Sequence, residues 1–194
     1  MEIIGIIIVA ILVNNVVFSQ FLGICPFMGV SKKLDTAIGM GAAVTFVLTL
    51  ATLVSFLIQK GILEPFGLEY LQTITFIFVI ASLVQMVEII IKKISPPLYQ
   101  ALGVFLPLIT TNCVILGVAI LVIQKDYNLL ESIIYAISTA IGYAMALIIF
   151  SSIREQLTLT KIPKAMQGVP IALITAGILA MAFMGFSGID QVFK

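Results

Sequence analysis

The sequence predicts an all-α membrane protein with six transmembrane helices, arranged as a 3+3 inverted repeat in which spans one and four are discontinuous. Hydrophobic residues make up 61% of the 194 residues, and charged residues only 10%. So few charges could not cover the surface of a soluble domain of this size. The chain is therefore predicted to form a single integral membrane domain, residues 1–194.

Uncharged stretches between clusters of charge define the six predicted spans, each long enough to cross a bilayer core of about 30 Å as a helix. They are residues 3–31, 36–59, 70–87, 94–124, 132–153 and 165–189. The start, Met1-Glu2, carries an acid where a cleaved signal peptide has basic residues. We therefore expect the first span to be retained.

Basic residues gather in the loops that follow the odd-numbered spans. Those loops hold Lys32, Lys33, Lys92, Lys93, Arg154, Lys161 and Lys164, whereas the opposite side holds Lys60, Lys125 and Lys194. An even number of spans puts both termini on one side, and the positive-inside rule predicts that this side is the non-cytoplasmic face of the inner (cytoplasmic) membrane. The net charge of +1 gives no indication of nucleic-acid binding.

Spans one and four contain residues that interrupt helices, whereas the other four read as ordinary membrane helices. Both hold proline and short polar runs: Asn14-Asn15 and Pro26 in the first, Pro107 and Thr110-Thr111-Asn112 in the fourth. Proline removes a backbone donor, and Asn and Thr side chains can satisfy the groups that it frees. These two spans are therefore predicted to be discontinuous.

The two broken spans also open the predicted half-repeats, about residues 1–93 and 94–194. Because each half holds an odd number of spans, the halves must have opposite orientations, and in such folds broken helices meet near the midplane. A straight helix would carry Cys25 to the cytoplasmic face, so it reaches the midplane only if the chain breaks between Asn14 and Gly23. A competing similarity, between residues 103–110 and 168–175, would instead relate spans four and six in parallel.

The chain has two cysteines, Cys25 and Cys113, and each begins the pattern Cys-x-x-x-Gly-Val. Soft thiolates select iron–sulfur clusters, Zn or Cu(I), and a [2Fe-2S] cluster normally takes four cysteines. Two thiols are thus half of such a site, and a partner would supply the rest. The alternative is a pair of inert thiols that fill apolar space. The absence of histidine from the sequence excludes histidine-ligated haem.

Other polar residues in the spans have two interpretations each. The set Asn14, Asn15, Thr110, Thr111 and Asn112 could line an ion or electron path, or could satisfy the backbone of broken helices. Glu88 could belong to such a path, or could pair with Lys92 four residues later. Small residues at helical spacing, such as Gly41 and Gly142, predict close helix packing. The Lys32-Lys33 pair could contact lipid headgroups.

Several longer motifs resemble a known family. They are Asn14-Asn15, residues 20–33 (QFLGICPFMGVSKK) and residues 106–117 (LPLITTNCVILG), with shorter matches at 95–99, 153–155, 172–177 and 183–188. On these residues the chain resembles, essentially from end to end, the A subunits of the Rnf complexes. The E subunit of the sodium-pumping NADH:quinone reductase, Nqr, is the next most similar.

The resemblance implies a component of a multisubunit translocase that couples electron transfer between ferredoxin and NAD to the transport of Na+ or H+. It implies one [2Fe-2S] cluster within the membrane, shared with the homologous, inverted E subunit, with Cys25 and Cys113 as this chain's ligands. The D, G, B and C subunits and membrane lipid are the other implied partners. The residues by themselves leave two other classes open: a secondary transporter or channel without a redox centre, and a purely structural assembly protein.

Overall fold

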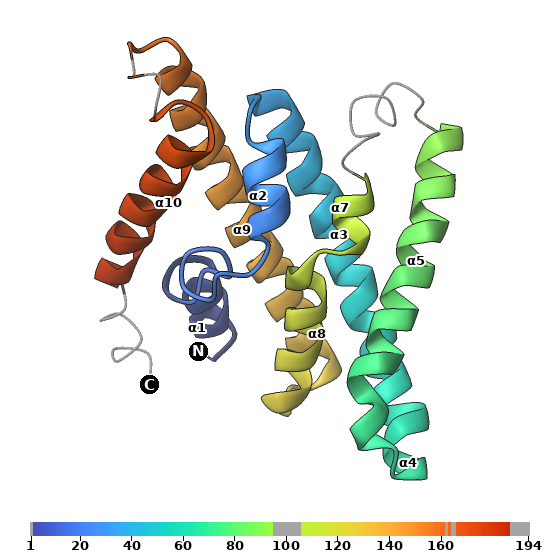
Figure 1. The fold of residues 1–194 in the computed structure, drawn as a ribbon. Helices are drawn as coiled ribbons and strands as arrows, with labels where there is room; N and C mark the ends of the chain where they lie inside the picture. Colours follow the sequence, from blue (N-terminus) through green and yellow to red (C-terminus); the bar gives the residue numbers. More distant parts are fainter. Residues whose placement is uncertain (1, 95–105, 162, 164–165, 187–194) are drawn as a thin grey trace.

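A computed structural model describes residues 2–94, 106–161, 163 and 166–186, and every regular element in these residues is helical (Figure 1). The first half holds α1 (Glu2–Ile8), η1 (Val9–Val13), α2 (Ile24–Val30), α3 (Leu34–Ile58), η2 (Gln59–Leu63), α4 (Glu64–Phe66), η3 (Glu69–Leu71) and α5 (Gln72–Ile94). The second holds α7 (Leu106–Thr110), α8 (Cys113–Gln124), α9 (Leu129–Thr158) and α10 (Val169–Met184).

Four helical segments are long and apolar enough to cross a membrane: Leu34–Phe66, Gln72–Ile90, Pro107–Gln124 and Leu129–Thr158. Two shorter apolar helices, Ile3–Val13 and Val169–Met184, lie where spans one and six are predicted. The all-helical, multi-pass membrane fold is therefore confirmed. The 3+3 repeat stays a prediction, and its boundary at residue 94 adjoins residues 95–105, which lie outside the described part.

Span two is longer than predicted, and the last span begins near its expected start, each for a local reason. Span two is expected to end at Gln59, but helical structure continues through η2 and α4 to Phe66, where Gly67 takes a left-handed conformation (φ 64°). Glycine is the residue that most readily adopts this helix-ending conformation. In the last span α10 begins at Val169, with Pro170 in the first turn, where proline is tolerated because its missing N–H has no partner within the helix.

Helices α3 and α9 form the centre of the molecule, with α8, α5, α1 and η1 packed around them. Glycines allow the backbones to approach closely. A Cβ at Gly41 would lie 3.0 Å from the Cβ of Ala144, and one at Gly142 would lie 3.2 Å from the Cα of Ile11. The prediction that these small residues serve helix packing is confirmed.

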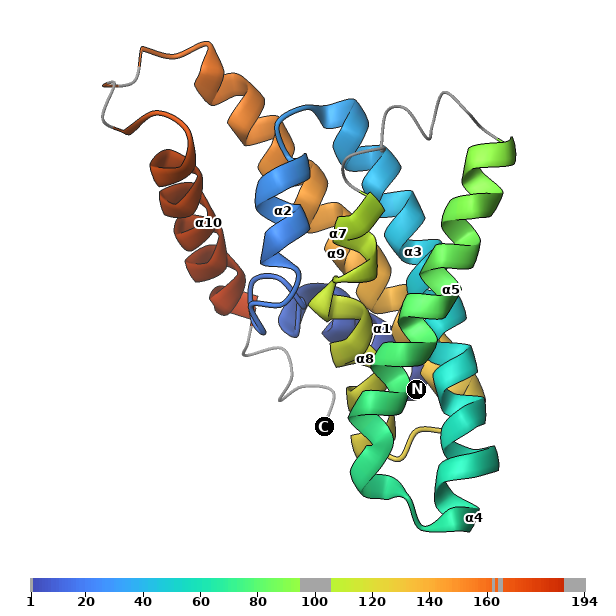
Figure 2. The ribbon, with the colours of Figure 1, turned by 45° about the vertical axis from the view of Figure 1, so that its right-hand side comes forward.

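Both broken spans are interrupted where the sequence predicts. Helical structure stops at Val13 and resumes at Ile24, and the second break separates Thr110 from Cys113. The first break includes left-handed backbone at Phe21 (φ 55°) and Gly23 (φ 74°). In both views α2 and α7 lie in one half of the molecule and α1 and α8 in the other, so α2 and α8 start near the middle and run apart (Figures 1 and 2).

The ends of the molecule differ in charge. The α2–α3 loop and the C-terminal ends of α5 and α9 lie at one end, whereas α4 and the α8–α9 turn lie at the other (Figures 1 and 2). Among the described residues these segments carry Lys32, Lys33, Lys92, Lys93 and Arg154 at the first end; at the second they carry Lys125, and Lys60 lies on η2 just before α4. The α2–α3 loop and the C-terminal ends of α5 and α9, which end the odd-numbered spans, therefore lie at one end of the molecule, as the predicted topology requires.

Candidate functional site

The two cysteines lie at the starts of the two half-helices that follow the breaks. Cys25 is the second residue of α2, and Cys113 is the first residue of α8. Both are exposed on the surface of this chain. Neither thiol fills space in the core, so both are accessible to a second polypeptide or a shared group.

A backbone hydrogen bond brings the two breaks together. The N–H of Gly23 donates to Cys113 Sγ at 2.9 Å. Gly23 precedes Cys25 by two residues, and consecutive Cα atoms are about 3.8 Å apart, so the two cysteines lie near one another.

Gly23 can make this bond because it has no side chain. A Cβ there would lie 2.5 Å from Val114 Cγ2 and 2.9 Å from Tyr143 Cε2, and the backbone is left-handed. Any larger residue would push the loop away from Cys113. The sequence alone assigns Gly23 no function, although its place two residues before a cysteine is a usable signal.

Two asparagines stabilise the breaks. Asn112 caps α8, since its Oδ1 accepts the N–H of Val114 at 3.1 Å. Asn15 is fully buried, and its Nδ2 donates to the carbonyls of Ile11 (3.1 Å) and Gly142 (3.0 Å). Its Oδ1 accepts a backbone N–H as well. Asn15 therefore satisfies broken backbone, whereas the buried Nδ2 of Asn112 has no partner within the described part.

The remaining predicted path residues lie in different places. The N–H of Asn14 donates to the carbonyl of Val9 and closes the end of η1. Thr110 ends α7, and the hydroxyl of Thr111 donates to the carbonyl of Pro107 at 3.1 Å. Glu88 is half-buried on α5. Of the six residues, the structure thus brings Asn112 to the cysteines, with Thr110 and Thr111 next to it along the chain.

Tyr143 is a site residue that the sequence did not indicate. It is fully buried on α9, against Gly23. Its hydroxyl lies near the Asn112 side chain and the two cysteines. An aromatic residue in an apolar span looks like any other core residue, so sequence alone gave no signal.

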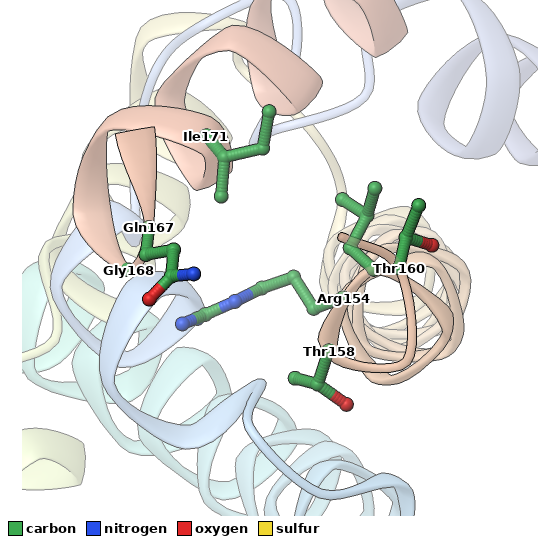
Figure 3. Close-up of a pocket in the computed structure, with 7 residues that line it drawn as sticks. Arg154, Thr158, Thr160, Gln167, Gly168 and Ile171 are labelled. Atoms are coloured by element: carbon green, nitrogen blue, oxygen red, sulfur yellow. The ribbon is translucent and has the colours of Figure 1, made fainter. Parts of the chain in front are cut away.

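Two contacts from α9 hold α2, the helix that carries Cys25. Arg154 Nη1 donates to the carbonyl of Met28 (2.9 Å) and to Ser31 Oγ (2.8 Å). The Phe27 and Phe150 rings stack with centroids 4.2 Å apart. Arg154 reaches into a pocket of about 260 Å³ between the end of α9 and the start of α10, with its guanidinium toward Gln167 (Figure 3). The sequence predicted that Arg154 helps to set the topology, and the structure shows in addition that its side chain holds α2.

The donor set fits half of a cluster site. Among the described residues there is no group of three or more His, Cys, Asp or Glu side chains that could hold a metal ion. Two exposed thiols, one of them bonded to a backbone donor, match half of the four-cysteine ligation of a [2Fe-2S] cluster. A complete four-cysteine cluster would need two further thiolates.

Comparisons with known proteins agree with these features. The chain is 58% identical, over 97% of its length and 98% of the relative's, to the A subunit of the Na(+)-translocating ferredoxin:NAD(+) oxidoreductase complex of Acetobacterium woodii. It is 56% identical to the A subunit of the ion-translocating oxidoreductase complex of Syntrophotalea carbinolica, over 93% of each chain, and 53% identical to that of Vibrio cholerae El Tor, over 94% of each. A family model described as "Rnf-Nqr subunit, membrane protein" matches residues 3–190, and the chain therefore belongs to the Rnf-Nqr family.

Proposed function

We propose that this chain is a membrane subunit of an ion-translocating ferredoxin:NAD oxidoreductase complex and holds half of a [2Fe-2S] cluster through Cys25 and Cys113. The observation that carries the proposal is the hydrogen bond from Gly23 to Cys113 Sγ, which joins the two helix breaks at one exposed two-thiol site. The names of its relatives, which are subunits of ion-translocating oxidoreductases, supply the class of reaction.

Each residue of the site has a role toward this group. When bound, the cluster would accept and release one electron at a time. Cys25 and Cys113 would ligate its iron. The N–H of Gly23 holds a partial positive charge next to the Cys113 sulfur. This charge would favour the reduced, more negative state of the cluster. Buried Tyr143 covers the inner side of Gly23 and keeps water from it.

The partner follows from the number of ligands and from the symmetry. A second copy of this chain would have the same orientation, because it has the same bias of basic residues. A two-fold axis in the membrane plane requires a partner that is upside down, and so of opposite bias. The partner is therefore a homologue with inverted topology, the E subunit of such complexes, with the D, G, B and C subunits as further components.

The orientation follows from the distribution of charge. The end that carries Lys32, Lys33 and Arg154 faces the cytoplasm, and α4 faces the opposite side of the inner membrane. The half-helices α2 and α8 start at the cysteine site and run toward opposite faces. Reduction of the cluster would add one negative charge there, which would favour a nearby cation. The same charge would bias α2 and α8 toward one face of the membrane, and in this way the redox state would be coupled to ion movement.

The proposal is tested by the iron and acid-labile sulfide content of purified protein. Produced without its partners, this chain should insert in the membrane with little or no cluster. Co-expressed with its inverted homologue, it should gain one [2Fe-2S] cluster per heterodimer, with the corresponding absorption and EPR signals. A stoichiometric cluster on the isolated chain would reject the shared site, and no iron in the assembled pair would favour a transporter or a structural assembly protein.

A further inference from the structure

Three polar residues lie on one face of α3 and η2, toward the end of the molecule where α4 lies: Thr52, Ser55 and Gln59. None is more than 4% exposed. Each nevertheless has a side-chain oxygen that finds no hydrogen-bond partner among the residues that the structure describes. Their spacing of three and then four residues puts them one above another, over about 10 Å of the helix axis.

Other hydroxyls on the same helix are paired. Ser and Thr in helices usually donate to the carbonyl four residues earlier. Thr45 donates in this way to Gly41 (2.7 Å), and Thr49 donates to Thr45 (2.8 Å). The structure contains no such bond for Thr52 or Ser55. Buried polar groups are rarely left without a partner, so these oxygens indicate water or a bound ion.

The row ends at a pocket of about 100 Å³ between η2–α4 and the end of α8, which is large enough for water molecules. Gln59 lines this pocket, together with Lys60, Glu64 and Asp126. The two acidic residues are exposed, and the Lys60 ammonium lies over the Phe56 ring at 5.2 Å. The pocket is therefore lined by two exposed carboxylates and by buried Gln59, whose amide oxygen has no partner among the described residues.

The helix itself is irregular at this point. Gln59–Leu63 forms a π-helical turn, and the N–H of Glu64 donates to the carbonyl of Gln59. Single π-turns within α-helices are frequent at functional sites because they re-aim side chains. Here the turn begins at Gln59, the residue that connects the pocket to the polar row.

We propose that Thr52, Ser55, Gln59 and this pocket form a hydrated access site for Na+ on the non-cytoplasmic side of the protein. The side-chain oxygens of Thr52, Ser55 and Gln59 are neutral ligands, which suit a hard monovalent cation. The exposed carboxylates of the pocket attract cations. Polar groups buried within spans commonly mark ion paths. The proposal rests on the proposed function in ion translocation, and it adds a helix face that the predicted path residues do not include.

Accessibility to water tests the site without any redox reaction. Ser55→Cys and Thr49→Cys are introduced into the complete complex in sealed vesicles, with the unmodified complex as background for the two native cysteines. A small cationic methanethiosulfonate reagent added from the α4 side should modify Ser55→Cys much faster than Thr49→Cys, and Na+ should slow the reaction more than choline does. Equal rates for the two variants would overturn the proposal, whatever the fate of the cluster.

Transport tests whether the site carries Na+. In proteoliposomes, Gln59→Leu and Thr52→Val should lower ²²Na+ uptake per electron several-fold and raise the Na+ concentration for half-maximal activity. Electron transfer in leaky vesicles should persist. Thr45→Val, which removes a paired hydroxyl from the same helix, is the control. Uptake in Gln59→Leu equal to the control would refute the site, and a defect confined to proton uptake would refute its assignment to Na+.

Discussion

The backbone N–H of Gly23 donates a hydrogen bond to the Sγ of Cys113, at 2.9 Å and across 90 residues of sequence. This bond ties the loop that leads into α2 to the first residue of α8. The two half-helices that carry the cysteines thus share one anchor point. Loss of that point should disturb both halves of the site together.

Replacement of Gly23 by alanine should abolish the cluster. The new Cβ would lie 2.5 Å from Val114 Cγ2, and the left-handed backbone adds a cost of about 1–2 kcal/mol. Gly67→Ala is the matched control, since Gly67 is also left-handed but a Cβ there would meet no atom within 4 Å. We expect iron content to fall in Gly23→Ala and to stay normal in Gly67→Ala. Normal iron content in both variants would show that the cluster does not depend on Gly23.

Arg154→Met should loosen α2. The change removes two hydrogen bonds, to Met28 and Ser31, and each hydrogen bond to a charged donor contributes about 1.5–3 kcal/mol. We expect a lower melting temperature of the complex, together with a shifted midpoint potential or broadened EPR signal of the cluster, because α2 carries Cys25. Lys161→Met, an exposed basic residue near the same face, is the control. A stability loss with unchanged EPR and potential would limit Arg154 to a structural role.

Reporter fusions should establish the topology. Fusions after Lys33, Lys93 and Lys161 should read cytoplasmic, because basic residues favour the cytoplasmic side of the membrane, and a fusion at Lys194 should read external. Fusions that are active in the cytoplasm, such as green fluorescent protein, and fusions that are active outside, such as alkaline phosphatase, give opposite signals at each site. A cytoplasmic C-terminus would reverse the orientation and would move the proposed Na+ access site to the cytoplasmic face.

The sequence predicted those parts of the structure that depend on local chemistry. Proline and asparagine residues predicted the positions of both helix breaks. The repeated Cys-x-x-x-Gly-Val motif indicated that Cys25 and Cys113 have equivalent roles. Contacts made across the fold were not predictable. Tyr143, the Arg154 clamp and the unpaired hydroxyl of Ser55 each depend on which helix faces which, and an apolar composition conceals that information. The extension of span two past Gln59 was missed because the predicted span ended before the charged Lys60. Neither Gln59 nor Lys60 breaks a helix, so the helix continues.

The central claim is that Cys25 and Cys113 supply two of four cluster ligands, and EPR of the reduced complex tests it most directly. In Cys25→Ser and in Cys113→Ser we predict the loss of one [2Fe-2S] signal and of its two irons, because a hydroxyl replaces a soft thiolate poorly. Thr111→Val, next to the site, should keep both. Full iron content, an unchanged spectrum and normal turnover in both cysteine variants would contradict the claim.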